Sequence, residues 1–143
     1  MPSSYVDNHF HVVFSTKNRE RSIGYVLQPK LWAYMAGIVK NHGMKALAVG
    51  GMEDHIHGLL SLPGTVSIAK AVQVLKANSS RWMNESRVGR FEWQDGYFSC
   101  TVSRSQISRV MAYIANQKEH HKKRDYPAEM AWMLKVHGFE TEV

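Results

Sequence analysis

The stretch His9-Phe-His-Val-Val-Phe14 decides the fold, because apolar side chains recur at every second position. Residues two apart in an extended strand lie on the same face, so Phe10, Val12 and Phe14 share one face. The pattern therefore predicts a strand within residues 5–16, with one face in the core and different side chains on the opposite face.

Helix and strand patterns alternate downstream of this stretch. In chain order they predict a helix over about 27–41, strands over 44–49 and 55–62, a helix over 67–85, and a final strand or strand pair over 91–102. Gly50-Gly51 marks a turn between the two middle strands, and Ser67 caps the second helix. Asp95-Gly96 indicates a bend within the last β segment.

The resulting order β-α-β-β-α-β predicts an α+β fold. It is a ferredoxin-like split βαβ antiparallel sheet, with helices on one side and the first and third strands as central neighbours. Ser103 and Gln106 have capping-box spacing and predict one extra long helix that ends near Lys123. Its core-facing residues are expected to be Ile107, Val110, Met111 and Ile114, and a short helix is expected after Pro127.

The composition bounds the class of protein. We expect a single domain over residues 1–143. The net charge of +6 favours an anionic partner such as a phosphate backbone, although many basic proteins carry such charge only for solubility. The one cysteine, Cys100, excludes an intrachain disulfide framework. Signal-peptide and membrane-span patterns are absent from the sequence, so we expect a cytoplasmic protein.

Two His-x-His pairs are candidate metal ligands. Because side chains two apart share a strand face, either His9 with His11 or His55 with His57 can hold one cation. Imidazoles also serve as hydrogen-bonded core residues, and spacing alone does not choose between the pairs. Asp54 precedes the second pair and is a candidate hydrogen-bond partner for it.

Tyr113 and Gln117 are four residues apart on the predicted extra helix, so one face presents a phenol and an amide together. Tyr113 lies beside the apolar stripe of that helix rather than on it. Two imidazoles and an amide oxygen leave coordination positions open for phosphate oxygens, which is typical of a catalytic rather than a structural metal site. Considered singly, Tyr113 is also compatible with packing and Gln117 with a solvated helix face.

Basic side chains near these residues have two interpretations. The run 118–124 is either a charged helix end or a surface that binds phosphates beside the tyrosine. The candidate DNA contacts are Lys17, Arg19, Arg21, Lys76, Arg81, Lys118, His121 and Lys122. Trp93, Tyr97 and Phe98 can stack on bases, although a core position is favoured for most of them.

Five strings occur in a fixed order along the chain. They are His11-Val-Val-Phe-Ser-Thr-Lys17, Asp54-His-Ile-His57, Leu75-Lys-Ala-Asn-Ser-Ser-Arg-Trp82, Trp93-Gln-Asp-Gly-Tyr97 and Tyr113-Ile-Ala-Asn-Gln-Lys-Glu-His-His121. Together they resemble the small single-tyrosine transposases of the HUH endonuclease superfamily, which compact bacterial insertion sequences carry. The resemblance spans nearly the whole chain, and five ordered motifs are far more specific than any one of them.

This resemblance implies roles for individual residues. His55 and His57 match the paired metal-binding histidines, Gln117 the third ligand of a Mg²⁺ or Mn²⁺ ion, and Tyr113 the nucleophile. Asp54 and His11 are then expected as hydrogen-bond partners around the ligands. The implied reaction cuts and rejoins single-stranded, hairpin-bearing DNA through a 5′-phosphotyrosine. The resemblance also implies a homodimer in which one subunit's tyrosine helix can complete the partner's site.

Three other functions remain compatible with the sequence. A ferredoxin-like module that binds single strands without cutting would use the same basic and aromatic side chains. A domesticated relative would nick or bind genomic hairpins without moving its own gene. A metal-dependent hydrolase of small molecules would leave the tyrosine and the basic run without a role. Imidazole and oxygen ligands would also accept Zn²⁺ or Co²⁺.

Overall fold

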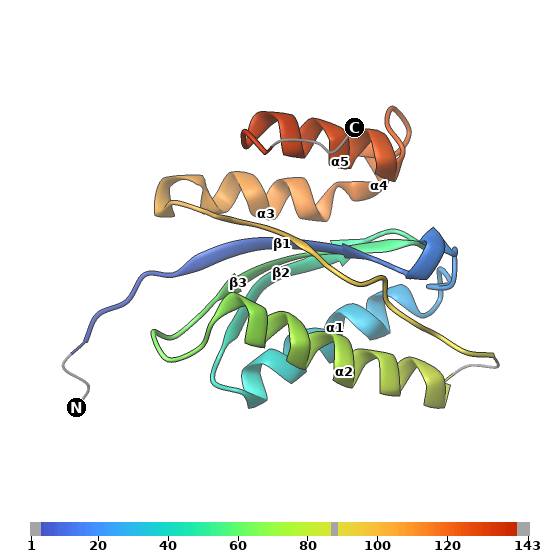
Figure 1. Cartoon of the computed structure of the whole chain (residues 1–143), viewed down its shortest axis with the longest axis horizontal. Coiled ribbons are helices and arrows are strands. Elements are labelled where there is room, and N and C mark those ends of the chain that lie inside the picture. Colours follow the sequence, from blue (N-terminus) through green and yellow to red (C-terminus); the bar gives the residue numbers. More distant parts are fainter. Residues whose placement is uncertain (1–3, 87–88, 140–143) are drawn as a thin grey trace.

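The computed structural model describes residues 4–86 and 89–139, and its centre is one four-stranded antiparallel sheet (Figure 1). The strands are β1 (His9–Ser15), β2 (Lys45–Gly51), β3 (His55–Ser61) and β4 (Phe98–Thr101). Their order is β2-β3-β1-β4, so β1 and β3 are central neighbours, as predicted. Residues 1–3, 87–88 and 140–143 of the expected single domain lie outside the described part.

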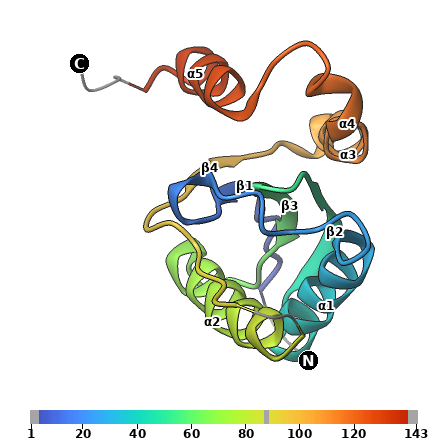
Figure 2. The same cartoon turned by 90° about the vertical axis from the view of Figure 1, so that its right-hand side faces the viewer.

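Helices cover both faces of the sheet. On one face lie α1 (Gln28–Asn41) and α2 (Ile68–Ser86), and on the other lie α3 (Ile107–Ala115), α4 (Gln117–His120) and α5 (Tyr126–Val136). Figure 2 shows the sheet between these two helical layers. The expected ferredoxin-like α+β arrangement, with α1 and α2 on one side and a further helix carrying Tyr113, is confirmed. None of the helices in the described ranges is long and apolar enough to cross a membrane.

The strand alternation assigns each side chain to a layer. Phe14 pairs with Ile56 and Val12 with Gly58 in the β1–β3 ladder. The apolar residues among these pack into the main core together with buried residues of α1 and α2. The intervening positions face α3 and α5. Because the side-chain period of a strand is two, the core pattern that buries Phe14 places the β3 histidines on the opposite face.

The last β segment is shorter than expected. Only residues 98–101 form a strand, and residue Trp93 joins the sheet through a single bridge to Thr16. The backbone between them bends at Gly96, whose φ of +86° is a conformation that favours glycine. Trp93 and Phe98 are buried whereas Tyr97 is exposed, so the preference for core positions holds for two of the three aromatic residues.

The single long helix expected over 103–123 is wrong. A 3₁₀ turn covers Arg104–Gln106, Ser103 makes no side-chain cap, and the helical path breaks at Asn116 between α3 and α4. Asparagine is a poor helix former because its short polar side chain competes for backbone hydrogen bonds. Met111 is exposed rather than in the core, whereas Ile114 is fully buried.

Gly50 and Gly51 lie within β2 rather than in the turn that the sequence indicated. A Cβ atom at Gly50 would lie 2.7 Å from the carbonyl oxygen of Ile114 in α3. Because contacts that short do not occur, only glycine lets α3 approach β2 this closely. The chain reverses after Gly51, where the amide of Met52 donates to the carbonyl of His55.

Candidate active site

His55 and His57 lie side by side on β3, fully buried on the face that α3 and α5 cover. One ring nitrogen of each is held in place by a neighbour. Asp54 Oδ1 lies 2.8 Å from His55 Nδ1, and His11 Nε2 lies 2.8 Å from His57 Nδ1. The Nε2 atoms of both rings are therefore directed toward the same space between the sheet and α5. His9 instead lies against Asp7 outside this cluster.

The carboxylate of Glu129 from α5 occupies that space. Its Oε1 atom lies 3.1 Å from His57 Nε2 and 3.4 Å from His55 Nε2. Its Oε2 atom accepts a hydrogen bond from the hydroxyl of Tyr113. Asp125 positions the helix by capping it, because its side chain accepts from the amide of Ala128. Glu129 therefore links the histidine pair to the tyrosine.

Sequence reasoning missed Glu129, although a signal was present. Glu129 and Met133 are four residues apart and both are buried in the structure, so the carboxylate lies on the apolar stripe of α5. A carboxylate on an apolar stripe requires polar partners, because burying an unpaired charge is costly. Those partners come from β3 and α3, and the helix pattern alone does not reveal them.

Gln117 and His121 complete the cluster. The Gln117 Oε1 atom lies 3.2 Å from His55 Nε2 and 3.2 Å from His121 Nε2. His121 Nε2 also lies 3.3 Å from Glu129 Oε1, so a residue expected to contact DNA lies inside the site. The nitrogen and oxygen atoms of His55, His121 and Glu129 that could bind a metal lie within 4.8 Å of one another. One divalent cation can bridge this spacing after small shifts.

Burial and hydrogen bonding set the charges of this site in opposite directions. Burial lowers the pKa of His57 to about 4, and burial together with the neighbouring His57 lowers the pKa of His11 to about 3. Burial also disfavours charge on His55, but hydrogen bonds to Asp54 and Glu129 raise its pKa to about 9. Burial opposes ionisation of Glu129, yet hydrogen bonds from His55 and His57 hold its pKa well below the usual range. In the metal-free site these pKa shifts favour ionised Glu129 and Asp54, a protonated His55, and neutral His11 and His57 at neutral pH.

Tyr113 lies half-buried at the edge of this cluster. Its ring centroid is 5.7 Å from that of His57 and 4.4 Å from that of His120, on which it stacks. Burial and the Glu129 carboxylate raise the pKa of its hydroxyl, so the phenol is protonated at neutral pH. Gln117 still follows one turn later despite the helix break, and its side-chain amide donates to the Tyr113 carbonyl.

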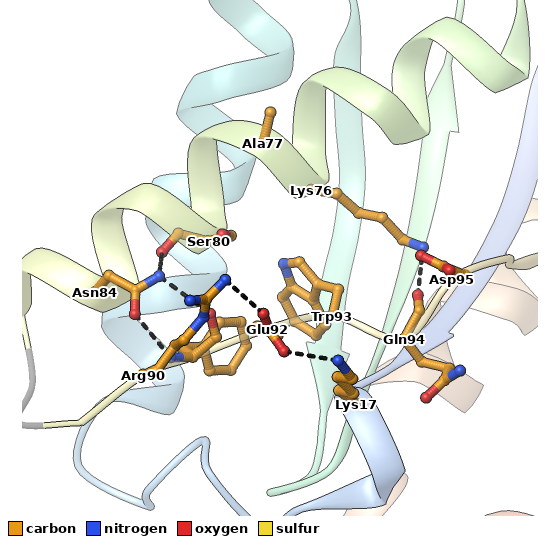
Figure 3. A pocket seen from close by; sticks show the side chains of 11 residues that line it. Lys17, Lys76, Ala77, Ser80, Asn84, Arg90, Glu92, Trp93, Gln94 and Asp95 are labelled. Atoms are coloured by element: carbon orange, nitrogen blue, oxygen red, sulfur yellow. Dashed lines mark hydrogen bonds and ion pairs between the residues drawn. The ribbon is translucent and has the colours of Figure 1, made fainter.

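Lys17 and Lys76 both line a cavity elsewhere, of about 650 Å³, between α2 and the segment before β4 (Figure 3). Lys17 pairs with Glu92 at 3.1 Å. The ammonium of Lys76 donates to the carbonyls of Gln94 and Gly96, both at 2.7 Å, and so fastens the bend to α2. This cavity lies on the α2 side of the sheet, away from Tyr113.

The remaining basic candidates are spread over the surface. Arg19 and Arg21 are exposed beyond β1, and Arg81 donates to Asn78 on α2. Lys118 lies over the ring of Tyr25 and Lys122 pairs with Glu119. The expected DNA contacts therefore come from several different elements, and some of them already have partners within the chain.

Known proteins share this sequence pattern. The family model described as "Transposase IS200 like" matches residues 4–117. The ISDra2 transposase TnpA of Deinococcus radiodurans is 26% identical over 117 residues, which cover 77% of this chain and 84% of that protein. The transposase for insertion sequence element IS200 of Salmonella typhimurium is 25% identical over 120 residues, which cover 79% of this chain and 78% of that protein.

Solved structures share the fold. A crystal structure of a transposase from Deinococcus radiodurans R1 superposes with a TM-score of 0.65 at 26% identity, covering 82% of this chain and 96% of that one. The structure of a REP-associated tyrosine transposase bound to a REP hairpin superposes with a TM-score of 0.63 at 14% identity, covering 85% and 73%. Because the family model matches residues 4–117, which is most of the chain, this chain belongs to the IS200-like transposase family.

Proposed function

We propose that this transposase cuts single-stranded DNA by attack of the Tyr113 hydroxyl oxygen on a phosphodiester. The observation that carries the proposal is the position of that hydroxyl, which lies against a buried cluster containing His55, His57 and Gln117. A tyrosine that only packed in the core would need no cluster of buried histidine, amide and carboxylate side chains beside its hydroxyl oxygen.

The residues fit a divalent metal ion such as Mg²⁺ or Mn²⁺. Asp54 and His11 hold the Nδ1 atoms of the two histidines, which leaves both Nε2 atoms for coordination, as is usual for metal-bound imidazoles. The oxygen of Gln117 lies within reach of His55 Nε2. When bound there, the ion would polarise the scissile phosphate. His55, His57 and Gln117 are therefore the proposed ligands.

The proposed reaction conserves the energy of the phosphodiester bond. The Tyr113 hydroxyl releases its proton as its oxygen forms a bond to phosphorus. The bond from phosphorus to the 3′ oxygen breaks, and that oxygen takes up a proton and leaves as a 3′-hydroxyl. Attack by a second 3′-hydroxyl on the 5′-phosphotyrosine reverses the step and joins a new pair of strands without ATP. The tyrosine regains its proton and the enzyme is restored.

The proposed substrate is single-stranded DNA next to a hairpin. A structural neighbour is described as bound to a REP hairpin, and the positive charge of this chain suits a phosphate backbone. A homodimer remains a prediction. Within one chain the ring centroids of Tyr113 and His57 lie 5.7 Å apart, which supports a site assembled inside a single subunit.

Covalent trapping tests the proposal. Labelled hairpin-bearing single strands from the gene's own flanks are incubated with the protein and Mn²⁺ or a chelator, and the products are separated on a denaturing gel. We expect a protein–DNA adduct that requires the metal, disappears in Tyr113→Phe, and persists in the control Tyr5→Phe, whose ring is 97% exposed. Binding of these strands without any adduct would instead indicate a non-cutting module or a domesticated relative.

A further inference from the structure

The carboxylate of Glu129 is a feature of the site that the family match does not cover. The match ends at Gln117, whereas Glu129 lies on α5. This helix follows α4 after a turn and packs on the same face of the sheet as α3. The side chain of Glu129 is 2% exposed, and every polar neighbour described for that side chain belongs to the proposed catalytic cluster. The inference below rests on the proposed metal-assisted function.

The geometry places one oxygen of Glu129 among three imidazoles. Oε1 lies 3.1 Å from His57 Nε2, 3.4 Å from His55 Nε2 and 3.3 Å from His121 Nε2. Imidazole nitrogens and a carboxylate oxygen that converge in this way need to move by only about an ångström to share a cation at about 2.0–2.5 Å. Glu129 is thus already at coordination range of the proposed ligands.

The charges of the site lead to the same conclusion. His55, His57 and Gln117 are all buried and would coordinate as neutral ligands, so none of the three carries a negative charge to offset the two positive charges of the ion. Glu129 is the single buried carboxylate among residues 4–86 and 89–139. Mg²⁺ and Mn²⁺ also prefer carboxylate oxygen over nitrogen, so a set of two imidazoles and an amide alone would suit softer ions better.

We propose that Glu129 is an anionic ligand of the metal ion and that the same carboxylate positions the nucleophile. Oε1 faces the imidazoles and is available for the ion, whereas Oε2 accepts the hydroxyl of Tyr113. One side chain thereby sets the distance between the ion and the attacking oxygen. With His55, His57 and Gln117 as the other ligands, an ion held there would still have coordination positions open for phosphate oxygens or water.

Mn²⁺ affinity of the full chain is the direct test. After treatment with a chelator and its removal, Mn²⁺ is titrated into wild type, Glu129→Gln and the control Glu119→Gln, and binding is followed by calorimetry and by the electron paramagnetic resonance signal of free Mn²⁺. Glu129→Gln keeps the size of the side chain and removes its charge. We expect its Mn²⁺ affinity to fall at least tenfold, and that of Glu119→Gln, an exposed residue on α4, to stay within twofold of wild type.

A second measurement covers the case in which Glu129→Gln does not fold, as judged by circular dichroism. Wild-type protein labelled with ¹³C at glutamate side chains is saturated with diamagnetic Mg²⁺, and a coordinated carboxylate should give a shifted carboxyl resonance. The proposal is overturned if Glu129→Gln folds and binds Mn²⁺ as tightly as wild type, or if saturation with Mg²⁺ moves no glutamate carboxyl resonance.

These outcomes are separable from failure of the proposed function. If wild type forms no adduct with DNA but Glu129→Gln loses Mn²⁺ affinity, the ligand assignment stands and the nuclease proposal fails. If Glu129→Gln keeps Mn²⁺ affinity but forms no adduct, Glu129 acts on Tyr113 alone and the ligand assignment is wrong.

Discussion

At the scale of single residues, each ring of the histidine pair is oriented by a partner outside the pair. Asp54 holds His55 and His11 holds His57, in both cases through Nδ1. A ring whose rotation is restricted presents its other nitrogen to a cation at little entropic cost, and a carboxylate partner also makes the imidazole more basic. The other His-x-His pair, His9 and His11, therefore contributes one member, His11, as a partner of His57.

Asp54→Asn should weaken metal binding without unfolding the protein. The amide keeps the shape of the side chain but loses the charge that favours the Nδ1–H form of His55, so we expect Mn²⁺ affinity to fall about 10- to 100-fold. Calorimetric titration measures this change. Asp7→Asn, which alters an exposed carboxylate near His9, is the control and should match wild type. Equal affinities for both variants would argue against a supporting role for Asp54.

The stability of the metal-free protein should fall as the pH is lowered from about 6.5 toward 4.5. His11 and His57 have folded-state pKa values of about 3 and 4, below the unfolded value of 6.5, so the unfolded chain binds more protons in this window. The lowered pKa values of Asp54 and Glu129 act mainly below this range. His55 has the opposite sign, because its raised pKa of about 9 contributes stability that is lost between pH 6.5 and 9.

Urea unfolding with chelator present, at pH 4.5, 6.5 and 9, measures these effects. We expect the highest unfolding free energy near pH 6.5. A variant with His57→Asn should show a smaller loss between pH 6.5 and 4.5, since it removes one of the two histidines responsible. A stability that rises steadily from pH 6.5 to 4.5 would contradict the assigned charges.

At the scale of elements, the position of Tyr113 depends on how closely α3 lies on β2. Gly50 permits this approach, because a side chain there would collide with the backbone carbonyl of Ile114, the residue after the tyrosine. The break at Asn116 then turns the chain so that α4 brings Gln117 and α5 brings Glu129 toward the same histidines. Tyr113 and Gln117 are thus carried by two short helices, α3 and α4, whereas one long helix was expected to carry both.

Gly50→Ala should destabilise the protein by about 1–3 kcal/mol, because the added methyl group forces α3 away from the sheet. Since α3 carries Tyr113, the adduct yield should fall in the same variant. Urea unfolding and the trapping gel measure the two effects. Gly24→Ala is the matched control, because a Cβ atom at Gly24 meets nothing within 4 Å, and it should change stability by less than about 0.5 kcal/mol. A Gly50→Ala protein as stable as this control would show that α3 can move without cost.

At the scale of the whole molecule, the excess of positive charge is distributed rather than concentrated. Several lysines and arginines are already paired with carboxylates or carbonyls, as Lys17 is with Glu92 and Lys76 with the bend before β4. Arg19 and Arg21 are exposed beyond the end of β1, next to the start of β3 and its histidine pair, and Arg21 makes only a long ion pair of 4.0 Å with Glu53. We therefore expect these two arginines to contribute to the attraction of DNA.

Binding of single-stranded DNA should weaken as the salt concentration rises. The double variant Arg19→Gln/Arg21→Gln should have a shallower slope of log K against log salt concentration. The slope should decrease by about 0.7 for each phosphate that the variant no longer neutralises. Fluorescence anisotropy between 50 and 200 mM salt measures both slopes. The control Lys40→Gln/Lys45→Gln removes two exposed charges from the end of α1 and the opposite end of the sheet, and should keep the wild-type slope apart from a small general effect. Equal slopes for the two double variants would exclude a local contact.

The sequence by itself determined the order of strands and helices, the ferredoxin-like sheet and the face on which His55 and His57 lie. It could do so because helix and strand periodicities are local and assign each side chain to a face. It also predicted Tyr113 and Gln117 as site residues, and their one-turn spacing survives the helix break. Only the tertiary structure added Glu129 and His121 to the candidate site, placed Lys17 and Lys76 away from it, and placed Gly50 against α3. These features depend on how α3 and α5 pack over the sheet, and no local pattern in the chain records which distant side chains that packing brings together.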